Sequence, residues 1–62
     1  MLATIGRMYY VKDVPFRDPR EALVAAIAAE ELNVTVELNG AYVLTLTVAV
    51  GRDGIPLLAL AL

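Results

Sequence analysis

The side chains that most often perform nucleophilic or acid–base chemistry are scarce in this chain. It has no cysteine, histidine or serine, and Lys12 is its only lysine. Without these groups the ordinary catalytic dyads and triads cannot be built. We therefore expect that the protein is not an enzyme and that it has no catalytic residues.

The acidic residues do not form a pattern typical of a metal site. Glu30 and Glu31 are neighbours, and neighbouring helical positions point about 100° apart. Asp13 and Asp18 adjoin a proline-containing segment, where turn formation and helix capping account for such residues. The sequence also lacks a glycine-rich loop followed by a helix, the pattern that binds phosphate. We expect no metal site and no cofactor.

A second kind of chemistry, recognition of a partner, is suggested by residues 12–20, "KDVPFRDPR". Phe16 is the only phenylalanine, it lies between two prolines, and Arg17 and Arg20 are close to it in the sequence. Aromatic and arginine side chains on stiff loops are common energetic anchors of interfaces. We predict a recognition loop formed by Phe16, Arg17 and Arg20. The alternative is that Phe16 belongs to the core, either folding back onto the helix start as a hydrophobic staple or filling the end of the sheet.

The best-marked element is a helix predicted over residues 19–32. Asp18 can cap its N-terminus, Pro19 suits the first helical position, and Glu21 follows the cap by three residues. At 100° per residue the larger side chains Leu23, Val24 and Ile27 share one side. The opposite side is made of alanines, which are either exposed or allow another helix or sheet to approach closely.

Strands are predicted over residues 2–11, 33–38, 41–50 and 55–62, because β-branched and aromatic residues alternate there between turn signals. The register that keeps like faces together favours three-residue loops at 38–40 and 52–54, rather than a two-residue turn at Asn39–Gly40. The first loop then places Val36 opposite Tyr42 and Val34 opposite Leu44. The predicted fold class is α+β, a single small domain over residues 1–62 with one helix packed on an antiparallel meander, in the order β-α-β-β-β.

Apolar side chains exceed what so small a domain can bury. Hydrophobic residues make up 60% of the chain, against a typical 45–50%. A helix is about 10–12 Å wide and strands lie about 4.8 Å apart, so one helix covers little more than two strands. We therefore predict an interface that combines the uncovered sheet face with the alanine side of the helix: Leu44, Leu46, Val48, Leu58, Leu60, Leu62, Ala22, Ala25 and Ala29.

These features predict a homo-oligomer or an obligate protein partner. An acidic pI near 4.7 argues against a nucleic-acid partner. No run of about 18 apolar residues is long enough for a membrane span, and no signal-peptide pattern is evident. We expect a cytoplasmic location or a place in an assembled particle. The leading hypothesis is a structural, self-assembling subunit, for example of a phage or viral particle, and the alternative is a small binding module that uses the 12–20 loop as a ligand-binding oligomer or inhibitor of a partner protein.

Overall fold

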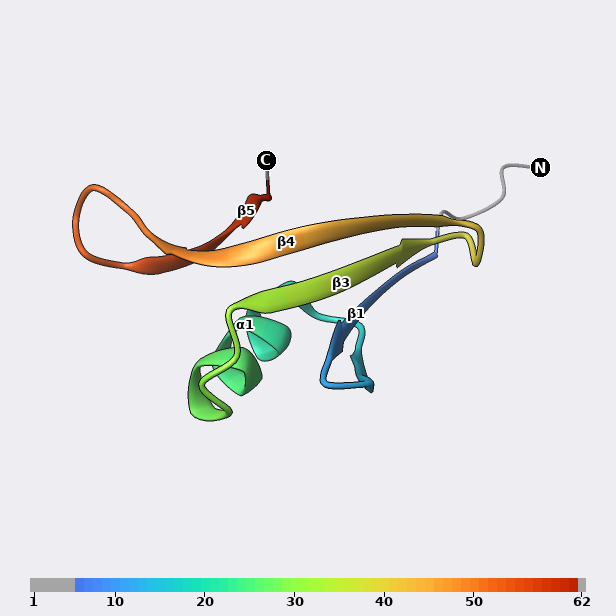
Figure 1. Ribbon diagram of the computed structural model, residues 1–62, viewed down its shortest axis with the longest axis horizontal. Helices are drawn as coiled ribbons and strands as arrows, with labels where there is room; N and C mark the ends of the chain where they lie inside the picture. The colour runs from blue at the N-terminus through green and yellow to red at the C-terminus, as the bar shows by residue number, and fades with distance from the viewer. Residues whose placement is uncertain (1–5, 62) are drawn as a thin grey trace.

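The computed structural model describes residues 6–61, while residues 1–5 and 62 lie outside the described part. The described residues form one helix and a five-stranded antiparallel sheet, so the predicted α+β class is confirmed (Figure 1). The sheet order is β2-β1-β3-β4-β5. The elements, in chain order, are β1 (Arg7–Val11), β2 (Val14–Phe16), α1 (Pro19–Ala28), β3 (Asn33–Leu38), β4 (Tyr42–Val50) and β5 (Pro56–Leu60).

Strand β2 is absent from the predicted order, which has to be corrected to β-β-α-β-β-β. It forms a hairpin with β1 in which Val11 pairs with Val14. Lys12 and Asp13 connect the two strands, and both have positive φ, 48° and 68°. A two-residue turn with two positive φ angles matches the right-handed twist of its strands. The predicted first strand is observed from Arg7, and its residues 2–5 lie outside the described part.

The start of α1 is as predicted. Asp18 is the N-cap, its side-chain oxygen accepts a hydrogen bond from the Arg20 amide at 2.9 Å, and Pro19 is the first helical residue. This carboxylate satisfies one of the amides that the first turn leaves without an intrahelical partner.

The predicted end of the helix at residue 32 is wrong, because α1 ends at Ala28. The Glu30 amide donates to Ile27 and the Glu31 amide to Ala26, the two bonds of a Schellman motif. Glu30 adopts a φ of 55°, the left-handed conformation that this motif requires. The reversal lets the chain enter β3 at Asn33.

The first hairpin differs from the prediction by two residues in its register. Leu38 pairs with Tyr42 and Val36 with Leu44, so the loop is 39–41 and not 38–40. Asn39 and Gly40 both have positive φ, and the Ala41 amide donates to the Leu38 carbonyl at 3.1 Å. These are features of a type I′ turn, followed here by Ala41 as one extra residue.

The second hairpin has the predicted register. Val48 pairs with Leu58, Thr47 with Ala59 and Leu46 with Leu60. The Gly51 amide donates to the Ile55 carbonyl at 2.9 Å, which closes the predicted three-residue loop 52–54.

The core lies between α1 and the sheet, and it is small. Among the residues whose burial the structure describes, it consists of two helical alanines, Ala22 and Ala26, and four strand residues, Tyr9, Val11, Val34 and Val36. The strand members all come from β1 and β3, which are neighbours at the centre of the sheet. Val34 is the one large side chain among the described residues that is fully buried. The helix therefore shields the middle of the sheet and leaves much of β4 and β5 only partly covered.

Candidate interaction surface

The helix packs on the sheet with its alanine side. Ala22 and Ala26 are fully buried at 0% exposure, whereas Val24 and Ile27 on the other side of α1 are 65% and 47% exposed. Small side chains let the helix approach the sheet closely. The buried alanines therefore allow close packing of helix and sheet and are not left exposed. Ala22 was expected at an interface with another molecule, and this requires correction because the sheet of its own chain covers it completely.

The remaining helical positions of the predicted interface retain some accessible surface. Ala25 is partly buried and packs against the core, and Ala29 is exposed. Both line a shallow hollow of about 190 Å³ between α1 and the β1–β2 hairpin, together with Phe16. The hollow is small compared with ligand pockets of about 300–1,000 Å³.

The sheet residues of the predicted interface lie at the border of the core. Leu44, Leu46, Val48 and Leu58 are partly buried and pack against the core residues, and Leu60 is 54% exposed. All five lie on the side of the sheet that faces α1, as the pairing of Val36 with Leu44, Val48 with Leu58 and Leu46 with Leu60 requires. Leu62 lies outside the described residues.

Exposed apolar side chains gather on the β4–β5 hairpin. Four of them are here called the hairpin patch: Val50 and Leu60, on the side of the sheet that faces α1, and Ile55 and Leu57, on the opposite side. Val50 is the most exposed, at 73%. The hairpin extends past the helix, as Figure 1 shows at the left of the view, so α1 does not shield its end. The only charged residues on the hairpin are Arg52 and Asp53 in the loop.

Part of the hairpin patch was missed at the level of the sequence. Val50, Ile55 and Leu57 were assigned to strands but not to the interface. The uncharged run from Gly54 to Ala61 contains the signal that could have found Ile55 and Leu57, because a run of this kind is not typical of a solvated edge strand.

The predicted recognition loop is divided by the fold. Phe16 belongs to β2, is partly buried and packs against the core. It is therefore a structural residue of its own chain and not a free anchor for a partner. Arg17 and Arg20 are exposed, but Arg20 is in the first turn of α1 and lines a different hollow, with Val24 and Ala28. The three side chains therefore do not form one surface.

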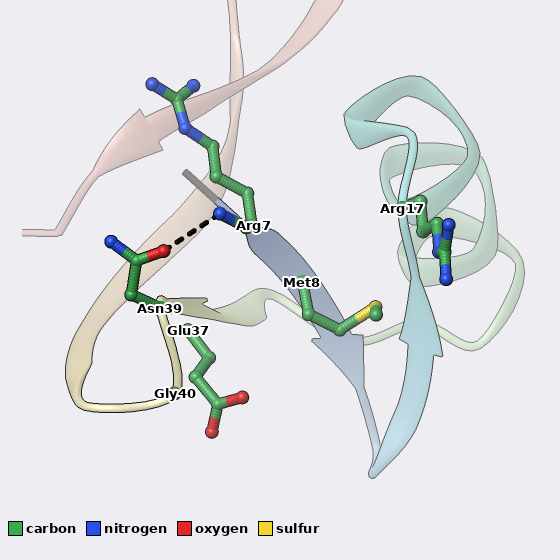
Figure 2. A pocket seen from close by; sticks show the side chains of 7 residues that line it. Arg7, Met8, Arg17, Glu37, Asn39 and Gly40 are labelled. Carbon is green, nitrogen blue, oxygen red and sulfur yellow. Dashed lines mark hydrogen bonds between the residues drawn. The ribbon is translucent and has the colours of Figure 1, made fainter. Parts of the chain in front are cut away.

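Arg17 instead lines an open groove of about 570 Å³ at the end of the sheet that holds the β3–β4 turn. The other lining residues are Gly6, Arg7, Met8, Glu37, Asn39 and Gly40. Figure 2 shows that Arg7 and Arg17 point in different directions on either side of Met8. The two guanidinium groups do not converge on a common point, so the groove lacks the paired donors that hold an anion.

The described residues contain no group of three or more acidic, histidine or cysteine side chains placed to hold a metal ion. Within the same residues no helix has the length and apolar character to cross a bilayer. Comparisons of the chain with protein-family models, with curated proteins and with solved structures found no match. The surface geometry is therefore the basis for the function proposed below.

Proposed function

We propose that this chain is a non-enzymatic subunit that assembles with copies of itself, and that the hairpin patch is the main contact surface. The observation that supports the proposal is the imbalance between buried and exposed apolar residues. Among the described residues, nine large hydrophobic side chains are more than 40% exposed, whereas the core has six residues, two of which are alanines. A monomer would leave this surface in water.

Burial of apolar surface contributes about 25 cal/mol per Å², and contiguous apolar patches above a few hundred Å² are unusual on soluble monomers. The hairpin patch places two exposed apolar side chains on each face of a hairpin whose outer strand, β5, has no charged residue, and a lack of charge is typical of an interface core. Association would bury this surface and would also protect β5 from unspecific pairing.

A binding module based on residues 12–20 has less support. It needs Phe16 to be free for a partner, and Phe16 packs against the core of its own chain. It also needs its arginines to act together, and Arg17 and Arg20 line different hollows.

The proposal is tested with a charge placed on the hairpin patch. Leu60→Glu would put a carboxylate where a partner removes water, so we expect dimer dissociation to become easier by about tenfold or more. Thr35→Glu adds the same charge at an exposed polar position of β3 and serves as the matched control. Size-exclusion chromatography with light scattering measures the mass of each variant at several concentrations.

We expect the wild type and Thr35→Glu to have masses above the 6.7 kDa of one chain, and Leu60→Glu to shift towards that value. A folded wild-type protein that elutes as a monomer at every concentration would overturn the proposal. An assembled Leu60→Glu variant as stable as Thr35→Glu would show that the hairpin patch is not the contact surface.

A further inference from the structure

The outer edge of β5 has backbone groups that no described residue pairs with. In an antiparallel ladder, successive residues direct their amide and carbonyl groups alternately towards the two sides of the strand. The Ala61 amide donates to the Thr45 carbonyl, and the Ile55 carbonyl accepts from the Gly51 amide. Odd-numbered residues of this strand therefore face β4. The amides of Leu58 and Leu60 consequently point outward, since β5 is the last strand of the sheet.

The opposite edge of the sheet is blocked. In the two-residue hairpin between β1 and β2, Val11 and Val14 flank the turn and form a hydrogen-bonded pair. Val14 and Phe16 then face β1, and the one outward position of β2 is Pro15. Proline has no amide hydrogen, so β2 offers no donor to another strand. Short edge strands and edge prolines are known protections against strand addition.

We propose that the outer edge of β5 pairs with the outer edge of β5 in a second copy of the chain. This inference rests on the proposed self-assembly and specifies its geometry. The two strands run antiparallel about a two-fold axis that passes beside Ala59, with Leu58 opposite Leu60 of the partner subunit. This register uses both outward donors of each chain, since each pair exchanges two hydrogen bonds. It also leaves Pro56, the outward position without a donor, outside the paired centre.

The side chains near this axis are compatible with the pairing. Between Gly54 and Ala61 the chain has no charged residue, so no like charges are brought together. Leu58 and Leu60 of one chain lie on the side of the sheet that faces α1, and the proposed register places the same two residues of the partner beside them. The exposed part of Leu60 would thereby become buried.

The proposed dimer is closed. The two sheets become one continuous sheet whose free edges are the β2 strands of the two chains, and these are blocked by Pro15. A head-to-tail arrangement would pair β5 with β2 and could grow into a fibre, but β2 has no outward donor to sustain it. The contrast between the two edges therefore selects a two-fold dimer over an open filament.

Residue-resolved amide hydrogen exchange on the intact protein tests this geometry. Within one chain no described residue accepts from the Leu58 and Leu60 amides, whereas the Ala59 amide faces β4. We expect the Leu58 and Leu60 amides to exchange at least tenfold more slowly at concentrations where the protein is dimeric than after dilution to the monomer. Fast exchange of both amides in a protein of dimeric mass would overturn edge pairing while leaving self-assembly intact. A protein that is always monomeric contradicts the proposed function itself.

A pair of variants separates the backbone contribution from that of the side chain. Leu60→Pro removes one outward donor but no hydrogen bond to β4, while Leu60→Ala shortens the side chain and keeps the donor. We expect the dimer of Leu60→Pro to dissociate at a concentration at least tenfold higher than that of Leu60→Ala, with the helical circular dichroism of both retained. Equal dissociation of two folded variants would contradict pairing through this edge. If Leu60→Pro does not fold, the exchange experiment on the wild type decides the question.

Discussion

Asn39 and Gly6 form a reciprocal pair of hydrogen bonds. The Gly6 amide donates to the Asn39 side-chain oxygen at 3.0 Å, and the Asn39 amide donates to the Gly6 carbonyl at 2.8 Å. Figure 2 shows the side-chain bond beside the groove. The pair connects the β3–β4 turn to the residue that precedes β1. Asn39 also has a φ of 52°, a conformation that asparagine tolerates better than most residues.

The first prediction concerns Asn39→Ala. The substitution removes the acceptor for Gly6 and puts alanine, which tolerates the left-handed region less well than asparagine, at a positive φ, so we expect the free energy of unfolding to fall by about 1–2 kcal/mol. Asn39→Gly is the control, because it loses the side-chain bond but adopts the positive φ without strain. We expect about half the loss for glycine. Urea unfolding at matched protomer concentration measures both values, and an alanine variant as stable as the wild type would refute the dual role.

The second prediction tests the close contact between helix and sheet. Ala26 is fully buried, so Ala26→Leu has no space for the added atoms and should lower the free energy of unfolding by about 1–3 kcal/mol. Ala28→Leu introduces the same side chain at an exposed position of α1 and should change the stability by less than about 0.5 kcal/mol. Equal thermal stabilities of the two variants would mean that α1 does not pack through its alanine side.

The third prediction uses the end of the helix. Glu30 has positive φ at the position where glycine is usual. Glu30→Gly relieves this strain and should raise the free energy of unfolding by about 1 kcal/mol. Ala29, the C-cap residue, has a φ of −89°, so Ala29→Gly should bring no gain. Thermal unfolding of the two glycine variants checks the difference, and a gain for Ala29→Gly alone would contradict the observed motif.

The fourth prediction separates core from recognition at Phe16. The side chain is partly buried against the core, so we expect Phe16→Ala to lower the free energy of unfolding by roughly 2 kcal/mol, below the 3–5 typical of a fully buried phenylalanine. Arg17→Ala, at the next and exposed position, should stay within about 0.5 kcal/mol of the wild type. A Phe16→Ala variant with an unchanged denaturant midpoint would contradict a core role for Phe16 and would make it a candidate contact residue again.

The sequence predicts those parts of the fold that depend on local signals. Asp18 and Pro19 identify the start of α1, and the alternation of apolar residues identifies β3, β4 and β5. The register of the first hairpin could be predicted only in part. A shift of two residues leaves every side chain on the same face, so the apolar pattern cannot distinguish a loop at 38–40 from one at 39–41.

The errors have a common physical origin in positive φ angles at residues other than glycine. Lys12 and Asp13 form the turn that creates β2, and Glu30 ends the helix, but Lys12 and Glu30 are not residues that such positions normally select. Tertiary pairing of β2 with β1 and of β3 with its neighbours imposes these conformations. The interface could not be predicted for a different reason: both sides of α1 are apolar, so the sequence does not indicate which side faces the sheet.

The most direct test of self-assembly is the mass of the wild-type protein in solution. Native mass spectrometry, supported by sedimentation at several concentrations, reports it without any substitution. We predict a particle that contains at least two copies of the 6.7 kDa chain, and no more than two if the β5 strands of two chains pair. A folded protein that retains the mass of one chain up to about 100 μM, where even a weak interface with a Kd near 10 μM would be occupied, would contradict it.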